Sequence, residues 1–78
     1  MNIQKNERVR RALYEYFELY DYPSRKKVAS RIGLNYYRFN SFLNNNANYA
    51  DKSLQQIIKY LHKVEDRNNQ LKRIISSI

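Results

Sequence analysis

The 78-residue sequence predicts an all-α fold, a compact domain of four to five helices, on three observations. Apolar residues recur at spacings of three and four along most of the chain, which is the period of a helix face. No stretch alternates apolar and polar residues as a half-buried strand does. Pro23 and Gly33 are the only proline and glycine, so each should mark a specific turn and leave the remainder free to be helical.

The first helix is expected from about residue 4 to residue 20. Pro23 disfavours a helical conformation at the residue before it, so the helix should stop within residues 21–23. The buried face of this helix is predicted to consist of Val9, Ala12, Leu13, Tyr16, Phe17 and Tyr20.

The second helix is expected over residues 25–32. Ser24 precedes it and can cap an unpaired backbone N–H of the first turn. Gly33 follows it, at the place where a helix end often requires a left-handed residue. The residues predicted to face inward are Val28, Ala29 and Ile32.

The third helix should begin directly after Asn35, a favourable N-cap, and end at residues 44–46, which are all asparagine. Leu34 and Phe39 have the spacing of a hydrophobic staple across the start of this helix. Its predicted buried stripe consists of Phe39, Phe42 and Leu43.

A fourth helix should begin near Asp51, and no helix-breaking residue follows. Its apolar face comprises Leu54, Ile57, Ile58, Leu61 and Val64, and the pattern can continue to the C-terminus through Leu71, Ile74, Ile75 and Ile78. We therefore expect a domain over residues 1–66 and a C-terminal helical extension over residues 67–78.

The C-terminal apolar helix also has a heptad pattern. Positions 54, 61, 68 and 75 form one seam and positions 57, 64, 71 and 78 the other, with Asn68 as the one polar residue. A single asparagine in such a seam can specify register and strand number, which favours a homodimer. Two alternatives stay open for residues 71–78, folding back on the domain or fraying. The residues predicted to form the dimer contact are Val64, Asn68, Leu71, Ile75 and Ile78.

The positive charge is concentrated in the middle of the chain. The formal net charge is +8, and residues 25–48 carry five basic residues and no acidic one, whereas residues 1–24 are neutral overall. Such a block favours a polyanionic partner such as nucleic acid. The alternative is a solvated surface that only maintains solubility.

Two short helices joined by a turn that contains glycine describe a helix-turn-helix, here over residues 24–44. The sequence from residue 25, RKKVASRIGLNYYRFNSFLN, resembles the lambda-repressor/Cro-like helix-turn-helix family. The matching positions are Val28-Ala29 in the first helix of the motif, Ile32-Gly33-Leu34 at the turn, and the anchors Phe39 and Phe42 in the second helix. The resemblance covers residues 9–61. It departs from the family at Arg25, where glutamine is frequent, and at residues 44–46, where the family often has glycine.

The resemblance implies that the third helix is a recognition helix in the major groove of double-stranded DNA, with its first residues at the base edges. Helical geometry with Phe39 inward directs residues 37, 40, 41 and 44 outward and places residues 36 and 38 on the flanks. For Tyr36, packing against the fourth helix is the alternative. The candidate base-reading residues are Tyr36, Tyr37, Arg38, Asn40, Ser41 and Asn44.

Phosphate contacts are expected on both sides of this helix. Arg25 and Lys26 begin the second helix, where unpaired N–H groups already favour phosphate. For Lys27 and Arg31, the alternative to a phosphate contact is that the side chain is only exposed to solvent. The predicted phosphate-binding residues are Arg25, Lys26, Lys27, Asn45 and Lys52.

These observations favour a sequence-specific DNA-binding regulator, a repressor in the first instance, that binds a short operator as a dimer. An architectural or accessory DNA protein of a mobile element is one alternative, and an antitoxin or inhibitor that binds a protein partner is another. With no cysteine and His62 as the single histidine, no catalytic, metal or cofactor site is predicted, and no enzyme activity. No apolar run suggests a signal peptide or a membrane partner, so a cytoplasmic, nucleoid-associated location is expected.

Overall fold

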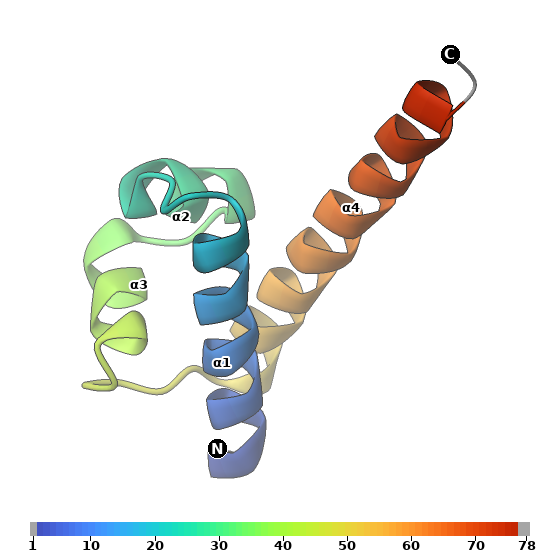
Figure 1. Cartoon of the computed structure of the whole chain (residues 1–78). Helices are drawn as coiled ribbons and strands as arrows, with labels where there is room; N and C mark the ends of the chain where they lie inside the picture. The colour runs from blue at the N-terminus through green and yellow to red at the C-terminus, as the bar shows by residue number, and fades with distance from the viewer. Residues whose placement is uncertain (1, 77–78) are drawn as a thin grey trace.

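Four helices make up the computed structural model, which describes residues 2–76 and their side chains up to residue 68 (Figure 1). They are α1 (Ile3–Leu19), α2 (Arg25–Ile32), α3 (Tyr36–Leu43) and α4 (Asp51–Ser76). No strand occurs among the described residues. The predicted all-α fold is confirmed, with four helices in this part of the chain.

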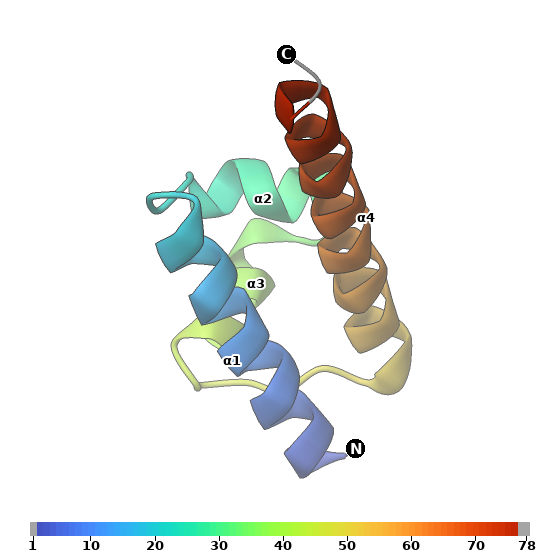
Figure 2. The same cartoon turned by 45° about the vertical axis from the view of Figure 1, so that its right-hand side comes forward.

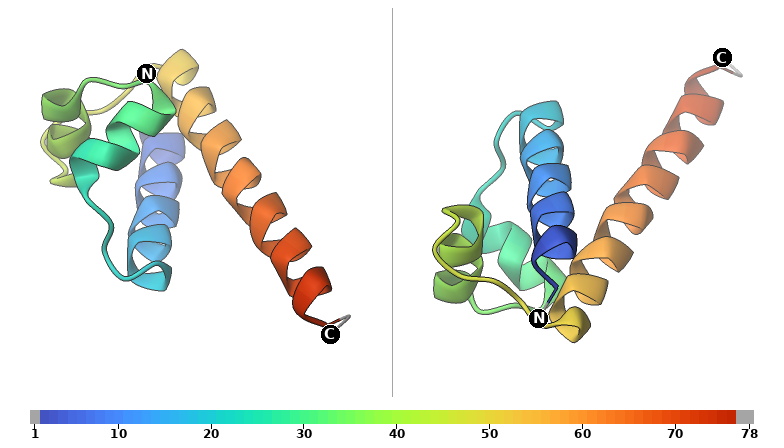
Figure 3. Two further views of the ribbon diagram at one scale, coloured as in Figure 1. Left: turned by 90° about the horizontal axis from the view of Figure 1, so that it is seen from above. Right: turned by 90° about the horizontal axis from the view of Figure 1, so that it is seen from below.

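The long helices α1 and α4 start at the same end of the molecule, run side by side and then diverge (Figures 1 and 3). The short helices α2 and α3 pack against each other, α3 also contacts α1, and α2 also contacts α4 (Figure 2). The second half of α4 extends away from the other helices, and the longest dimension of the molecule is 46 Å (Figure 1). The expected boundary between residues 66 and 67 therefore falls inside a continuous helix.

This course of α4 bears on the two alternatives for the C-terminal segment. The helix continues to Ser76 without a turn, so the backbone through that residue does not fold back on the domain. Ile78 lies outside the described residues.

An asparagine or serine side chain caps the start of each of the first three helices. The side-chain oxygen accepts a hydrogen bond from the backbone N–H three residues later: Asn2 from Lys5 at 3.0 Å, Ser24 from Lys27 at 3.4 Å and Asn35 from Arg38 at 3.2 Å. These bonds satisfy N–H groups that have no partner within the helix. The predicted caps Ser24 and Asn35 are confirmed.

The same three helices end in a left-handed residue: Asp21 at φ 60°, Gly33 at φ 93° and Asn45 at φ 61°. The N–H of the next residue bonds back to a carbonyl five positions earlier, at 2.6 Å from Tyr22, 2.8 Å from Leu34 and 2.9 Å from Asn46. This is the Schellman pattern, which satisfies carbonyls of the last turn.

The ends of α2 and α3 therefore agree with the sequence. The expected stop of α1 within residues 21–23 is confirmed, but its physical reason differs, because the expectation depended on Pro23. The reversal already occurs at Asp21 and at Tyr22, which has φ 54°, so α1 ends at Leu19 with Tyr20 as its C-cap.

The core draws on all four helices and on the loop before α4. Most predicted inward positions are buried, but Ala12, Tyr20, Ile58, Leu61 and Val64 are only partly buried, because they line two hollows between α1 and α4. The core residues are Val9, Leu13, Tyr16, Phe17, Val28, Ala29, Ile32, Phe39, Phe42, Leu43, Tyr49, Leu54 and Ile57.

Tyr49 joins this core from the loop, and a buried polar residue of α1 holds it there. Asn6 accepts a hydrogen bond from the Tyr49 N–H at 2.7 Å and donates to the Tyr49 carbonyl at 3.1 Å. One amide side chain thus satisfies both backbone groups of a buried residue that has no helix or strand partner.

Candidate nucleic-acid interface

The candidate interface is built on α2, the turn of residues 33–35 and α3. Ala29 is 1% exposed, and its small side chain lets α3 approach α2 closely. Gly33 is required for its backbone and not for space, because an added Cβ would have only the Gln56 amide nitrogen near it, at 3.8 Å. At φ +93° any other residue would be strained.

Two side chains of α1 contact the C-terminal end of α3 on its inner side, which faces the core. Arg10 donates from Nε to the Phe42 carbonyl at 2.6 Å, and its Cζ lies 4.5 Å from the centre of the Phe42 ring. The Tyr14 hydroxyl donates to the Leu43 carbonyl. A positive charge at these carbonyls is also favourable for the dipole of α3.

Arg10 extends the same support to the loop after α3. Its Nη2 donates to the Ala47 carbonyl at 3.1 Å and to Oδ1 of Asn48 at 2.8 Å. The sequence interpretation missed the positioning roles of Asn6 and Arg10. A signal for them existed, because residues 6, 10, 13 and 17 lie on one face of α1 at helical spacing, with two polar residues in line with Leu13 and Phe17.

On the opposite, outer side of α3, Arg25 connects the start of α2 to two asparagines one helical turn apart. Its Nη1 donates to Oδ1 of Asn40 at 2.7 Å and to Oδ1 of Asn44 at 3.0 Å. A guanidinium has no acceptor, so each amide oxygen must face Arg25 and each amide nitrogen is left available for another partner. Three predicted site residues are thereby brought together.

The remaining candidate base-reading residues differ in exposure. Tyr37 is 77% exposed and Arg38 is exposed, whereas Ser41 is half-buried. Tyr36 is half-buried against the core, with its ring centre 5.3 Å from that of Tyr37. The outer face of α3 thus presents one free aromatic ring beside the asparagine pair.

The predicted phosphate-binding residues do not form a single cluster. Lys26 and Lys27 lie exposed in the first turn of α2, next to Arg25. Asn45 is exposed at the end of α3, whereas Lys52 lies in the first turn of α4, across the loop from α3 (Figure 1).

Within residues 2–68, the ion pairs involve neither α2 nor α3. Lys5 pairs with Asp51, and Nδ1 of His62 lies 3.9 Å from Oε2 of Glu65. The basic residues of the candidate interface therefore have no carboxylate partner in that part of the chain, and their charge is available to an external anion.

The predicted dimer contact can be placed only in part. Val64 packs partly against the core and Asn68 is half-buried, both on the section of α4 that diverges from α1. The side chains of Leu71 and Ile75, and the whole of Ile78, lie outside the described residues.

Across the described helices, none combines the length and the apolar character needed to cross a membrane. Comparison of the chain with protein families, with curated proteins and with solved structures finds no match.

Proposed function

We propose that the chain is a sequence-specific DNA-binding regulator, with α2 and α3 forming a helix-turn-helix whose recognition helix is α3. The single observation that carries the proposal is the outer face of α3. It presents Tyr37, Asn40 and Asn44 outward, while its inner face is buried and its C-terminal end is fastened to α1. These contacts fix the position of the eight-residue helix on the domain. The major groove of DNA is wide enough to admit an α-helix, so α3 can serve as a recognition helix.

The chemistry of this face suits base edges. The amide nitrogens of Asn40 and Asn44 can donate to N7 or O6 of guanine, N7 of adenine or O4 of thymine. The ring of Tyr37 can contact a thymine methyl group, and its hydroxyl a base or a phosphate.

Arg25 combines two tasks in this proposal. One nitrogen positions the asparagines, and the other N–H groups can donate to a backbone phosphate beside the start of α2. Lys26 and Lys27 extend the phosphate contact along the same turn. Occupancy of a short operator would then block transcription, as a repressor does.

A symmetric dimer is part of the proposal. The heptad of α4 and its projection beyond the domain support pairing of two chains through the section that includes Val64 and Asn68. Two copies would then present two α3 helices to two half-sites.

The test is selection from a random library of DNA duplexes, followed by affinity measurements for the selected duplex and for random DNA over a range of salt concentrations. We expect an enriched motif with two half-sites, and a salt slope of about −0.9 per phosphate contact. Tyr37→Ala should weaken binding to the selected duplex about tenfold and binding to random DNA far less. Tyr22→Ala is the matched control, because Tyr22 is 71% exposed but lies outside α3.

Other outcomes would replace the proposal. Tight binding without a motif would favour the architectural role in replication, partition or recombination. Absence of binding even at low salt would favour a protein partner, in the manner of an antitoxin or inhibitor.

A further inference from the structure

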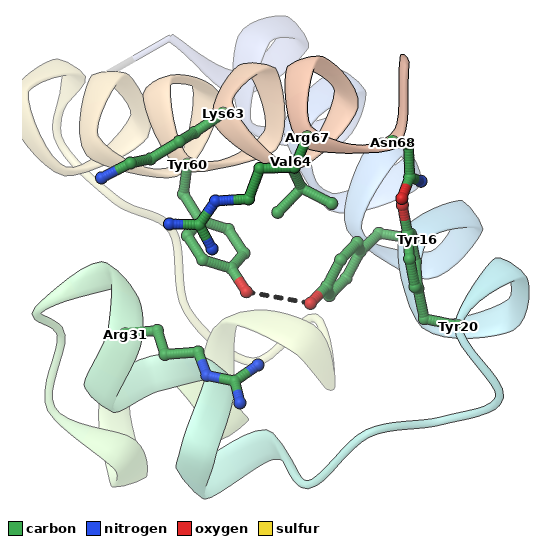
Figure 4. A pocket seen from close by; sticks show the side chains of 8 residues that line it. All are labelled: Tyr16, Tyr20, Arg31, Tyr60, Lys63, Val64, Arg67 and Asn68. Atoms are coloured by element: carbon green, nitrogen blue, oxygen red, sulfur yellow. Dashed lines mark hydrogen bonds between the residues drawn. The ribbon is translucent and has the colours of Figure 1, made fainter. Parts of the chain in front are cut away.

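A second cationic site lies away from α3, where the C-terminal ends of α1 and α2 face the middle of α4 (Figure 4). It is a cleft of about 440 Å³, within the range of roughly 300–1,000 Å³ that is typical of small-molecule sites. Of the residues weighed above as DNA contacts, Arg31 alone lines it, and Val64 and Asn68 at its edge also belong to the proposed dimer contact. The lining residues are Tyr16, Tyr20, Arg31, Tyr60, Lys63, Val64, Arg67 and Asn68.

Three cations from two helices line this cleft. Arg31 comes from α2, and Lys63 and Arg67 lie one turn apart on α4, on the opposite side of the cleft (Figure 4). No acidic residue lines it, and none of these three cations belongs to an ion pair within residues 2–68. A neighbouring hollow shares Arg31 and Lys63 and adds Lys59. The field in the cleft is therefore positive from both sides.

A pair of tyrosine hydroxyls lies between the cations. The hydroxyls of Tyr16 and Tyr60 are 2.9 Å apart and hydrogen-bonded to each other (Figure 4). One hydroxyl donates within the pair, so the proton of the other remains available to an external acceptor, and no second bond of either hydroxyl occurs within residues 2–68.

Tyr16 is suited to act as a neutral donor. Its side chain is only 8% exposed, and burial together with the contact to Tyr60 holds its pKa well above the usual value. The charge of Arg31 acts in the other direction on the same pKa. The site thus offers charged and neutral donors together and no carboxylate.

We propose that this cleft binds a polyphosphate group, either as inorganic polyphosphate or as the phosphate chain of a nucleoside di- or triphosphate. Several negative charges on adjacent phosphates match three cations placed on two walls, and their oxygens match the guanidinium and hydroxyl donors. The backbone of a DNA duplex fits less well, because its phosphates lie on a convex surface and Tyr16 is recessed between three helices. This inference does not depend on DNA binding by α3.

The test is a titration of the full chain with sodium tripolyphosphate at an ionic strength of about 0.15 M, followed by amide chemical shifts in NMR spectra and by calorimetry. We expect shifts at residues 31, 60, 63 and 67, with little change in α3. Arg31→Gln and Arg67→Gln should each raise the Kd about tenfold, the loss of a charge-assisted hydrogen bond.

Lys26→Gln is the matched control, because it removes the same charge from α2 outside the cleft, and it should alter the Kd by less than about twofold. Tyr60→Phe tests the hydroxyl pair and should weaken binding with α2 and α4 still folded, as the same spectra would verify. Tighter binding of a nucleoside triphosphate than of tripolyphosphate would identify the ligand as a nucleotide. Equal binding of the two would show that the cleft recognises only the phosphate chain.

Two results would overturn the inference. If Lys26→Gln weakened binding as much as Arg31→Gln, the phosphate would be a diffuse counterion of a basic surface. If a DNA duplex shifted the amides of the cleft and tripolyphosphate did not, the cleft would be a DNA contact instead. Neither result would bear on whether α3 reads bases.

Discussion

The guanidinium of Arg10 in α1 donates a 2.6 Å hydrogen bond to the carbonyl of Phe42 in the last turn of α3 and lies over the ring of the same residue. Arg10 is 6% exposed. Its guanidinium donates to three acceptors and contacts one aromatic ring, and it has no carboxylate partner among the described residues. This buried charge joins α1 to α3, the proposed recognition helix.

Replacing this arginine should therefore be costly. Arg10→Met keeps an apolar stem and removes every donor, so the carbonyls of Phe42 and Ala47 and the side-chain oxygen of Asn48 each lose a hydrogen bond. We expect a loss of roughly 2–3 kcal/mol in the free energy of unfolding, measured by urea denaturation. Arg11→Met, at the exposed neighbouring position, should have a far smaller effect. Equal effects of the two substitutions would show that the contacts of Arg10 do not stabilise the fold.

Asn45 should tolerate glycine better than alanine. It ends α3 at φ 61°, where a Cβ is strained and asparagine is tolerated. Asn45→Ala should lower the free energy of unfolding by about 1 kcal/mol, whereas Asn45→Gly should leave it nearly unchanged. Asn46→Ala is the control, because residue 46 has no positive φ. Thermal denaturation of the three variants would decide, and a loss at residue 46 as large as at residue 45 would contradict the explanation.

Tyr49 carries a hydroxyl that is buried and has no hydrogen-bond partner within the described residues. An unsatisfied buried hydroxyl is unfavourable, so Tyr49→Phe should raise the free energy of unfolding by about 1 kcal/mol. Tyr16→Phe is the contrasting variant, because the Tyr16 hydroxyl has Tyr60 as a partner, and it should be destabilising. A decrease in stability for Tyr49→Phe would show that its hydroxyl is satisfied after all.

Alkaline pH should destabilise the protein. Burial raises the pKa of Tyr16 and of Tyr49 in the folded state, so the folded chain holds these protons more tightly than the unfolded chain. Their contribution is complete below the ordinary tyrosine pKa of about 10 and is lost as the pH rises above it. Urea denaturation between neutral pH and pH ~11 should reveal this decline. In a Tyr16→Phe/Tyr49→Phe double variant the free energy of unfolding should decline less steeply with pH. An unchanged decline would show that other groups cause the effect.

Asn68 should control the association of chains, if the proposed heptad of α4 pairs them. Asn68→Leu makes the seam wholly apolar and should raise the oligomeric state or tighten the association, as measured by analytical ultracentrifugation. Gln55→Leu adds the same side chain at an exposed position outside the seam and should leave the mass unchanged. An unaltered mass for Asn68→Leu would reject the seam and leave DNA binding by a single chain.

Much of the backbone could be predicted because it depends on short-range chemistry. The caps Ser24 and Asn35 act on N–H groups three residues away, and Gly33 is required at a local reversal. Periodicity then identified the buried stripe of α3. The left-handed pair Asp21 and Tyr22 escaped prediction, because Pro23 beside it was sufficient reason for a helix to stop.

The candidate sites divide in the same way. That residues 37, 40 and 44 share the outer face of α3 follows from the helical period alone. That Arg25 holds Asn40 and Asn44 by their oxygens does not, because it depends on the angle at which α2 meets α3. Lys52 lies at the predicted start of α4, but its position across the loop from α3 depends on how that loop packs.

The sequence by itself determined that this chain is helical, where its first three helices begin, which faces they bury and where its positive charge is concentrated, since each depends on residues within about one turn of one another. Only the tertiary structure decided which polar groups meet. Arg10 reaches a carbonyl 32 residues away and Tyr16 a hydroxyl 44 residues away. Such contacts, and the polyphosphate cleft formed by Arg31 with α4, arise from how helices cross, and that is set by the packing of the whole core at once.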